Sequence, residues 1–591
     1  MIIIRKWLED RYNRVILLFK YPQYYVHILL VQNDYEICID CCNHLRENGI
    51  SEDYIAYAEF TCYYNTKNFQ KVMDVLDGNR IKYSDEILIR MAYSCASIGE
   101  YELAKDILLK LKKPKTKEEY ITLARLFFSI KEYYSSLTTI SDAYLKFPDD
   151  RSIQEYFIDL VYCHHIQPQS NNIANSFGNC LRAYRMADYN NKILQEISVP
   201  KDASGEDILK LISKHLPNDN DIDRRVETIY AHRLPISWYK SIFRKSLFSI
   251  HNMVIHSRNS QIWCTEQFGK DINSIRLEPV YIDLSSLITI DLLGLLSTIK
   301  KVFPKIYFTQ SVVNEILSFD NELCEPYCDH VLLNYGKKDD FFTKRSNSEI
   351  ITDMKNQIER IKSFVLSSDN IEIIGTVLSP RRSIIKHIDE FLSNYINVDI
   401  SESDTMRFGY IADCQVIIES VALRAAFNSF QNSPLAFGID SLLLFLFEKK
   451  LITEDKYFLL LTELIENNYK RIAVSVKHMF FIIRYEGYSI LEKHNKLFDI
   501  FASQDLNFEN VKVLLANLLT YIWNDIAPSN KKKGEWTDYL LGIITLNPLI
   551  DNESEYQILY YVRQQIITKQ NALYFFEYVK NRIYRFKAIN P

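Results

Sequence analysis

A short hydrophobic strand pattern that ends in a carboxylate constrains this chain more than any other feature. Val280-Tyr281-Ile282 runs directly into Asp283 and an apolar helical stretch, and a second strand pattern follows at 305–308. Two strands joined by a helical crossover are expected to lie parallel in one sheet. Ligands of open α/β sheets bind at the carboxyl ends of the strands. The pattern therefore predicts an α/β domain with Asp283 at its binding edge, in a chain that otherwise reads as helical.

Further acids accompany the next predicted elements of this region. The predicted strands are 280–282, 305–308, 371–375 and 415–418. Glu315 lies in the helical stretch after the second strand, and Glu419 directly follows the last one. Asp404 lies in a helical stretch before that last strand, and either Ser401 or Ser403 is expected to cap this helix.

This order of strands and acids resembles that of PIN-domain nucleases. Matched residue by residue, the four acidic positions of that family fall on Asp283, Glu315, Asp404 and Glu419. The likeness covers roughly residues 276 to 480 and includes the end of the domain, at 437–443, 448–453 and 464–469. The family usually has Asp at the last acidic position, where this chain has Glu419. Asp440 is the other candidate for that acid, although it lies where the family has a structural turn.

The resemblance implies metal-dependent cleavage of a phosphodiester. Carboxylate oxygens bind hard cations such as Mg²⁺ or Mn²⁺, which activate water and stabilise the attacking and leaving oxygens. Asp283 would bridge the metals, Glu315 and Asp404 would hold or orient them, and Glu419 would complete the site. We expect an endonuclease that cleaves RNA rather than DNA. The competing hypothesis is a non-catalytic adaptor that carries a degenerate PIN fold.

The N-terminal third is repetitive. An aromatic residue recurs at Tyr35, Phe69, Tyr101 and Tyr133, with spacings of 34, 32 and 32 residues. A period near 34 with two helices in each unit resembles tetratricopeptide (TPR) repeats. Such an array is expected to form a helical solenoid whose concave face binds a protein partner. We also expect Tyr101 and Tyr133 to occupy equivalent buried positions.

The predicted fold is mainly α with one α/β domain. The predicted segments are TPR-like repeats at 1–195, a helical connector at 196–275, the PIN-like domain at 276–480 and C-terminal helices at 481–591. This arrangement resembles bacterial conflict-associated TPR–PIN proteins, which implies a role in antiviral defence or in a toxin-like system. The residues assign no chemistry to the connector or to the C-terminal helices.

Composition narrows the choice of partner and compartment. The formal net charge is −5, so no global basic field attracts nucleic acid, and binding must be local. Basic residues that flank the acids in sequence are Lys337, Lys338, Lys344, Arg345, Arg381, Arg382 and Lys470. Eleven cysteines without framework spacing favour a reducing cytoplasm. No apolar run has the roughly 18 residues of a membrane span. An oligomer is possible.

Two cysteine groups suggest zinc but are better explained without it. They are Cys38, Cys41 and Cys42 with His44, and Cys324 and Cys328 with His330. Helical spacing spreads the first group around its helix, and the second group has no matching pair of ligands. Packed thiols are the preferred interpretation of the first group.

Overall fold

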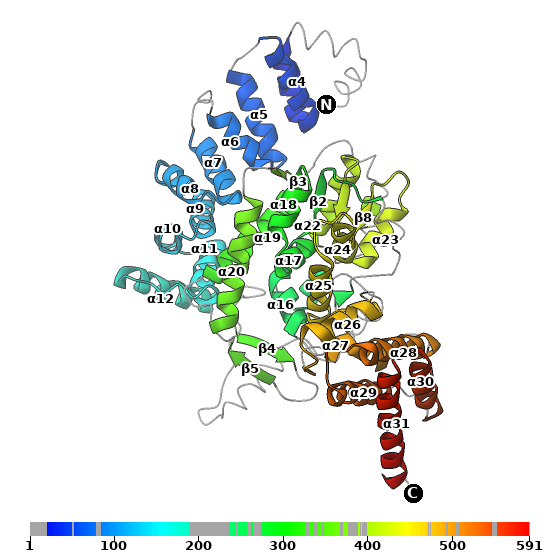
Figure 1. Cartoon of the computed structure of the whole chain (residues 1–591). Helices are drawn as coiled ribbons and strands as arrows, with labels where there is room; N and C mark the ends of the chain where they lie inside the picture. Colours follow the sequence, from blue (N-terminus) through cyan, green and yellow to red (C-terminus); the bar gives the residue numbers. More distant parts are fainter. Residues whose placement is uncertain are drawn as a thin grey trace, which may run out of the picture. The chain divides into compact units, whose positions relative to one another are not determined.

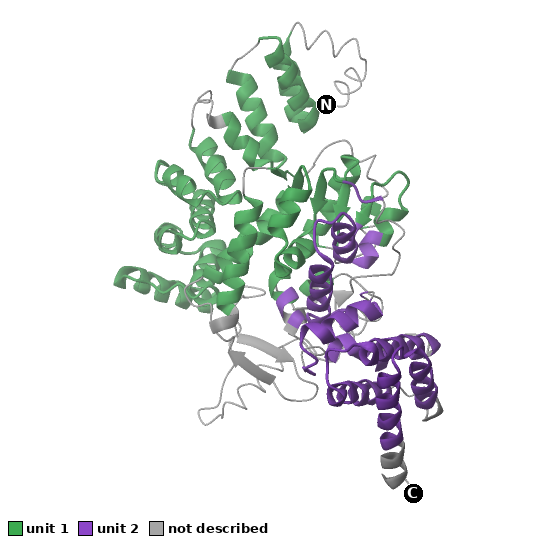
Figure 2. Cartoon of the chain, in the orientation of Figure 1, with its two compact units in different colours: residues 1–250, 277–418, 425–436 green, residues 251–276, 419–424, 437–591 purple. Residues whose placement is uncertain are grey.

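The computed structural model describes most of the chain. The described residues are 21–49, 53–77, 84–187, 236–243, 246–256, 262–263, 274–324, 331–335, 341–345, 348–366, 370–375, 388–390, 392, 399–470, 472, 474–491, 495–502, 508–546 and 552–589. The chain forms two compact units (Figure 2): residues 1–250, 277–418 and 425–436, and residues 251–276, 419–424 and 437–591. The four predicted segments stay a prediction, since the first unit contains both the N-terminal helices and most of the sheet. Within the described ranges, no helix is long and apolar enough to span a bilayer.

The N-terminal part of the first unit is a succession of helices that pack on near neighbours in the chain (Figure 1). They are α3 (Pro22–Gln32), α4 (Tyr35–Glu47), α5 (Asp53–Asn65), α6 (Phe69–Asp77), α7 (Asp85–Ser97), α8 (Tyr101–Leu108), α9 (Lys117–Ser129), α10 (Tyr133–Lys146), α11 (Arg151–Ile158), the π-helical η1 (Asp159–Cys163) and α12 (Asn171–Met186). Among them, α9 packs on α10, and α7 packs on both α8 and α9. Local capping fixes several starts. Thr116 and Glu119, for example, form a reciprocal capping box at the start of α9.

One turn recurs between these helices, and we call its four copies the repeat turns. Its left-handed residue is Asn33 (φ 60°), Lys67 (58°), Gly99 (82°) or Lys131 (66°), each two positions before a recurring aromatic. The amide of Glu100 donates to the Cys95 carbonyl (2.9 Å), and the equivalent bond from Glu132 is also 2.9 Å long. This is the hydrogen bond of a left-handed helix C-cap. The aromatic spacing therefore marks a repeated helix-ending turn.

The two segments that align best in sequence are also equivalent in structure. Tyr101 and Tyr133 each begin a helix, directly after a non-helical glutamate of nearly the same backbone geometry (φ −79°, ψ 65° and φ −84°, ψ 61°, respectively). Ala92 and Ala124, at matching places in α7 and α9, are both fully buried. Tyr101 and Tyr133 are both half-buried, so their expected equivalence is confirmed, whereas the expected burial is only partial.

The sheet of the chain is small, parallel and five-stranded. Its strands are β2 (Val280–Ile282), β3 (Ile306–Thr309), β6 (Ile371–Ile374), β7 (Gln415–Ile417) and β8 (Ala436–Phe437). The spatial order is β6-β3-β2-β7-β8, and Val280 pairs with Ile306 on one side and Gln415 on the other. All three β2 residues are buried, as expected for a strand covered on both faces. The four predicted strands are confirmed to within one residue at each end.

The strand order gives β2 a special position. The chain adds β3 and β6 on one side of β2, then returns to add β7 and β8 on the other. Ligands of open α/β sheets bind at such a reversal, outside the carboxyl ends of the strands. Asp283 is the first residue after β2, so it lies at the reversal point.

The remaining elements follow in chain order. Those of the middle region are α15 (Ser237–Phe243), α16 (Leu247–His256), α17 (Leu284–Leu292), α18 (Leu296–Val302), α19 (Gln310–Cys324), the antiparallel pair β4 (Val331–Tyr335) and β5 (Phe341–Arg345), α20 (Ser348–Val365), α22 (Ile400–Ile411) and α23 (Val421–Ser429). The elements of the second unit include the parallel pair β1 (Ile262–Trp263) and β9 (Tyr469–Lys470), α24 (Ile439–Glu448), α25 (Glu454–Glu466), α26 (Val476–Tyr485), α27 (Asn495–Phe498), η5 (Asp499–Ala502), α28 (Phe508–Asn524), α29 (Asn530–Ile544), α30 (Asn552–Gln565) and α31 (Lys569–Ile589).

Within the first unit, the repeat turns contact α19 and the end of β6. Gln310 donates to the Ser97 carbonyl (2.8 Å), and Asn321 donates to the Ser129 carbonyl (2.9 Å). Lys131 forms an ion pair with Asp320, with 2.8 Å between Nζ and Oδ2. These bonds satisfy carbonyls that helix ends leave open. The array and the sheet are therefore joined through the repeat turns.

Candidate functional site

Asp283 is placed by the strand before it and the helix after it. Its amide donates to the Ile417 carbonyl of β7 (3.1 Å), which extends the ladder by one residue. Its Oδ1 accepts from the Ser286 amide (2.7 Å), so the side chain caps α17. The residue is fully buried. A carboxylate is thus held at the reversal point of the sheet by its own backbone geometry.

Glu402 of α22 is the acid whose charge interacts with that of Asp283. The Glu402 side chain is fully buried. Burial is the larger cause that raises its pKa to about 8, and the nearby Asp283 charge is the second cause. Hydrogen bonds from the Ser237 hydroxyl (2.5 Å to Oε2) and the Asp399 amide act in the opposite direction. Sequence reasoning missed Glu402 as a site residue. Helix α22 packs across β2, β3 and β7, which brings it to this edge of the sheet.

Glu315 of α19 is joined to Asp399 by a lysine. Lys240 of α15 forms ion pairs with Glu315 and, at 2.7 Å, with Oδ2 of Asp399. Burial alone would raise the pKa of Asp399, but Lys240 and the Ser401 hydrogen bonds bring it below its usual value. Asp399 also caps α22 through the Ser401 amide (2.9 Å), so the predicted caps Ser401 and Ser403 were wrong.

Asp404 has a different set of neighbours. Two residues along a helix correspond to a rotation of about 200°, so Asp404 and Glu402 project from different faces of α22. Burial raises the pKa of Asp404, while the Ser311 hydroxyl and Arg407 act to lower it. Arg407 lies 3.2 Å from Asp404 Oδ1. Asp404 is therefore linked to the start of α19, one turn before Glu315.

The last predicted acid, Glu419, belongs to the second unit. It is buried, and its carbonyl accepts from the Arg424 guanidinium (3.2 Å). That guanidinium lies so close to Gly438 that a Cβ there would be 1.7 Å from it, so the Arg424 side chain would have to shift to admit one. Burial raises the pKa of Asp440, while the Arg424 charge acts to lower it. This arrangement agrees with the interpretation of Asp440 as part of a structural turn.

The donors suit a hard cation, but they are not gathered into a cage. Asp283, Glu402, Glu315 and Asp399 offer only carboxylate oxygens, the ligands that Mg²⁺ and Mn²⁺ prefer. A cation, the Lys240 ammonium, already lies between two of them. Yet in the described part of the chain, no group of three or more His, Cys, Asp or Glu side chains is arranged to hold a metal ion. The chemistry fits a metal, whereas the arrangement with Lys240 in place does not complete its coordination.

The sequence assigned no chemistry to the connector segment, yet two of its residues contact the acids of the candidate site. Ser237 and Lys240 both come from it, through α15. They lie 75 to 165 residues from the acids that they contact, so no local pattern in one sequence reveals the pairing. For Glu402 a signal did exist. Asp399 and Glu402 have the three-residue spacing of a capping box, which indicates where α22 begins and hence which acid lies in its first turn.

The cysteine groups behave differently from metal ligands where the structure describes them. Cys38, Cys41 and Cys42 are buried free thiols, and burial raises the pKa of Cys41 to about 12. They form part of a hydrophobic cluster, as expected for packed thiols. Cys328 and His330 lie outside the described residues, as do Lys337, Lys338, Arg381 and Arg382, and nothing is described of the side chains of Lys344, Arg345 and Lys470.

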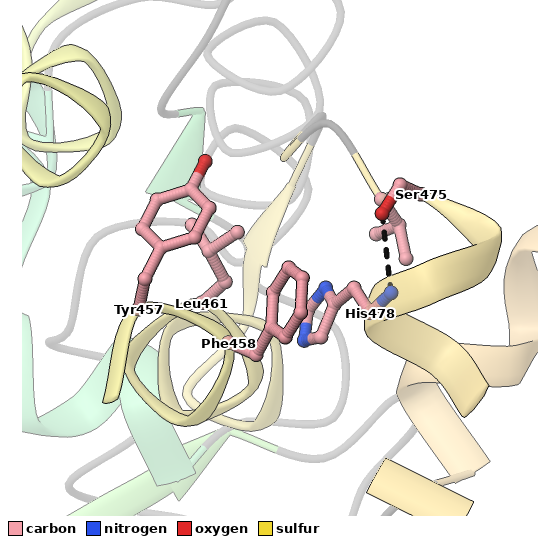
Figure 3. A pocket seen from close by; sticks show the side chains of 6 residues that line it. Tyr457, Phe458, Leu461, Ser475 and His478 are labelled. Carbon is pink, nitrogen blue, oxygen red and sulfur yellow. Dashed lines mark hydrogen bonds between the residues drawn. The ribbon is translucent and has the colours of Figure 1, made fainter. Parts of the chain in front are cut away.

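A pocket of about 240 Å³ lies in the second unit (Figure 3). Tyr457, Phe458 and Leu461 of α25 line it together with Val474, Ser475 and His478. The His478 ring stacks on Phe458 and its Nε2 lies 2.8 Å from the Thr462 hydroxyl. Burial lowers the pKa of His478 to about 4, so its imidazole is neutral. The lining has no charged group, and we assign it no reaction.

A scan against protein-family models and a search of curated proteins gave no match to this chain. The functional argument therefore depends on the geometry of the carboxylates at the sheet edge.

Proposed function

We propose that this chain is a metal-dependent endonuclease of the PIN type that cleaves RNA. The observation that carries the proposal is the buried pair of Asp283 and Glu402, at the carboxyl end of the strand where the sheet order reverses. Two buried carboxylates that repel one another gain most from a shared cation. Bound Mg²⁺ or Mn²⁺ would activate water and stabilise charge on the phosphodiester oxygens.

The residues of this chain would divide the work as follows. Asp283 and Glu402 would hold the metal, and Glu315 and Asp399 would extend the donor set once Lys240 is displaced. Asp404, bonded to Ser311 and Arg407, would orient α22 against α19. Glu419, placed last in the predicted set, would complete the site as the resemblance to PIN domains implies.

The N-terminal helices are proposed to be a TPR-like solenoid that recruits a protein partner. Four copies of one helix-ending turn support this proposal, because a fixed turn at a fixed spacing generates a regular superhelix. The resemblance implies a role in antiviral defence or a toxin-like system, and the cysteine usage favours action in the cytoplasm. Free thiols at all nine described cysteines are compatible with a reducing compartment.

The test compares Asp283→Asn with the wild type on single-stranded RNA, in Mn²⁺ or Mg²⁺, with EDTA as a control. Asparagine also caps helices, so the substitution keeps the α17 start and removes only the charge. We expect activity to be abolished and the metal-free fold to be no less stable, because acidic repulsion is relieved.

Asp291→Asn is the matched control. Asp291 is a second buried aspartate of α17, paired with Arg360 at 2.8 Å, away from the proposed metal. It should lose stability and retain cleavage. Equal cleavage by the wild type and Asp283→Asn would show that the activity lies elsewhere.

The alternative is a non-catalytic adaptor, and a specific observation favours it. Lys240 already neutralises part of the acidic cluster, and no three-carboxylate cage is formed among the described residues. Wild-type protein that cleaves neither RNA nor DNA, even with its partner present, would support the adaptor.

A further inference from the structure

Helix α15 lies over the carboxylates through one face. Ser237 and Lys240 are three residues apart, so they project from the same side of this helix. Ser237 donates to Glu402 at 2.5 Å, and Lys240 contacts Glu315 and Asp399. One short helix therefore contacts acids from both α19 and α22.

Lys240 is held in this position by more than a surface ion pair. Its side chain is 29% exposed, and that of Asp399 is 6% exposed. Its two partners come from elements that are 84 residues apart in sequence, at 315 and 399. Burial would lower the pKa of Lys240, but Asp399 and Glu315 together raise it, so the ammonium stays charged. A stable positive charge therefore sits between two carboxylates of the proposed site.

We infer that α15 is an internal inhibitor of the metal site, in which Lys240 competes with a divalent cation for the carboxylates of Glu315 and Asp399. This inference rests on the proposed function. An ammonium and a divalent cation repel strongly at contact distance, so both cannot use the same carboxylate oxygens. A divalent cation can therefore use Glu315 and Asp399 only after Lys240 withdraws, and the Ser237 hydrogen bond to Glu402 is lost when α15 moves with it.

The inhibitor also gives the connector a regulatory role. Because α15 contacts both Glu402 and the Glu315–Asp399 pair, any event that pulls it away frees these three carboxylates for a cation. A divalent cation and the ammonium group of Lys240 compete for the same carboxylates.

Direct measurement of Mn²⁺ binding tests the inference without any nuclease assay. Bound and free Mn²⁺ are separated by electron paramagnetic resonance for the wild type, Lys240→Gln and Lys305→Gln. The Lys305 variant is the matched control, because Lys305 also pairs with a glutamate (Glu372, 2.9 Å) but precedes β3 at the opposite end of the strands. Lys240→Gln should bind Mn²⁺ about ten- to a hundredfold more tightly than the wild type, the range expected for removing a charged hydrogen bond. Lys305→Gln should bind as the wild type does.

A second measurement uses the wild type alone, in case Lys240→Gln does not fold. Hydrogen exchange of the α15 amides should become faster when Mn²⁺ is added, while exchange in α17 should not.

The outcomes separate the two proposals. Equal, tight Mn²⁺ binding by all three proteins, lost in Asp283→Asn and without faster α15 exchange, would overturn the inhibitor and keep the metal site. Failure of every variant to bind Mn²⁺ would overturn both the metal-dependent function and the inhibitor. Tighter binding by Lys240→Gln, lost again in Lys240→Gln/Asp283→Asn, supports both.

Discussion

Gly375 offers the sharpest test of how the array meets the sheet. It follows β6 and is buried, and a Cβ added to it would lie 2.4 Å from the Thr66 carbonyl oxygen and 2.5 Å from the Asn68 amide nitrogen. Both atoms belong to the backbone of a repeat turn, so neither can rotate away as a flexible side chain would. Real Cβ contacts require more than 3.0 Å, and the array or the strand must therefore move. Overpacking of this kind costs about 1 to 3 kcal/mol, and rigid neighbours place Gly375→Ala at the upper end.

The matched control is a second glycine-to-alanine substitution, which is expected to raise the free energy of unfolding instead of lowering it. Gly178 lies in α12 of the same unit, and nothing is found within 4 Å of a Cβ built on it. Alanine favours the helix over glycine by about 1 kcal/mol, so Gly178→Ala should be stabilising. Urea unfolding measures both variants, and limited proteolysis of the first unit detects loosening of the array. If Gly375→Ala is neutral while Gly178→Ala stabilises, the repeat turn does not lie against β6.

Two further predictions concern charge. Asp320→Ala should destabilise the first unit by about 3 kcal/mol in urea unfolding, because it leaves Lys131 and Lys362, both partly buried, without their shared carboxylate. A loss no larger than that of a solvent-exposed ion pair would contradict a buried ion pair at Asp320. Burial lowers the pKa of His251 to about 3 and that of His478 to about 4 in the folded chain. Below pH 6.5 these two histidines are therefore protonated in the unfolded chain while they are still neutral in the folded chain. The free energy of unfolding should therefore fall by about 1.4 kcal/mol per pH unit for each histidine between pH 6.5 and 4, and His478→Phe should halve that part of the slope.

The sequence predicted the strands well because their signal is local. Val280-Tyr281-Ile282 is a short apolar run between Pro279 and Asp283, and such a run is typical of a buried parallel strand. Once the strands are correct, the position of Asp283 follows, since it is the next residue along the chain. The repeat spacing is also local, because each repeat turn is formed within a few residues.

The choice among the acids of α22 failed for a physical reason. Asp399, Glu402 and Asp404 lie within six positions, and the one that meets Asp283 depends on the rotation of α22 about its axis. That rotation is set by packing: Gly409 lies against Val416 of β7 so closely that a Cβ would be 2.2 Å from its Cγ1. The way in which two elements pack on each other cannot be predicted from the sequence of either element alone. For the same reason, the contacts of Lys240 could not be predicted from the sequence.

Helix α19 contacts both the repeat turns and the candidate metal site, through two different faces. Gln310, Leu317 and Asn321 meet the repeat turns, whereas Ser311 and Glu315 meet Asp404 and Lys240. The centres of the two sets lie roughly 120° apart around the helix axis. A helix is stiff, so a change at the repeat turns that shifts α19 must also move Glu315 relative to Lys240. A partner bound by the array can therefore favour release of α15 only if it prefers the shifted position of α19, since a ligand shifts an equilibrium only by its differential affinity for the two states.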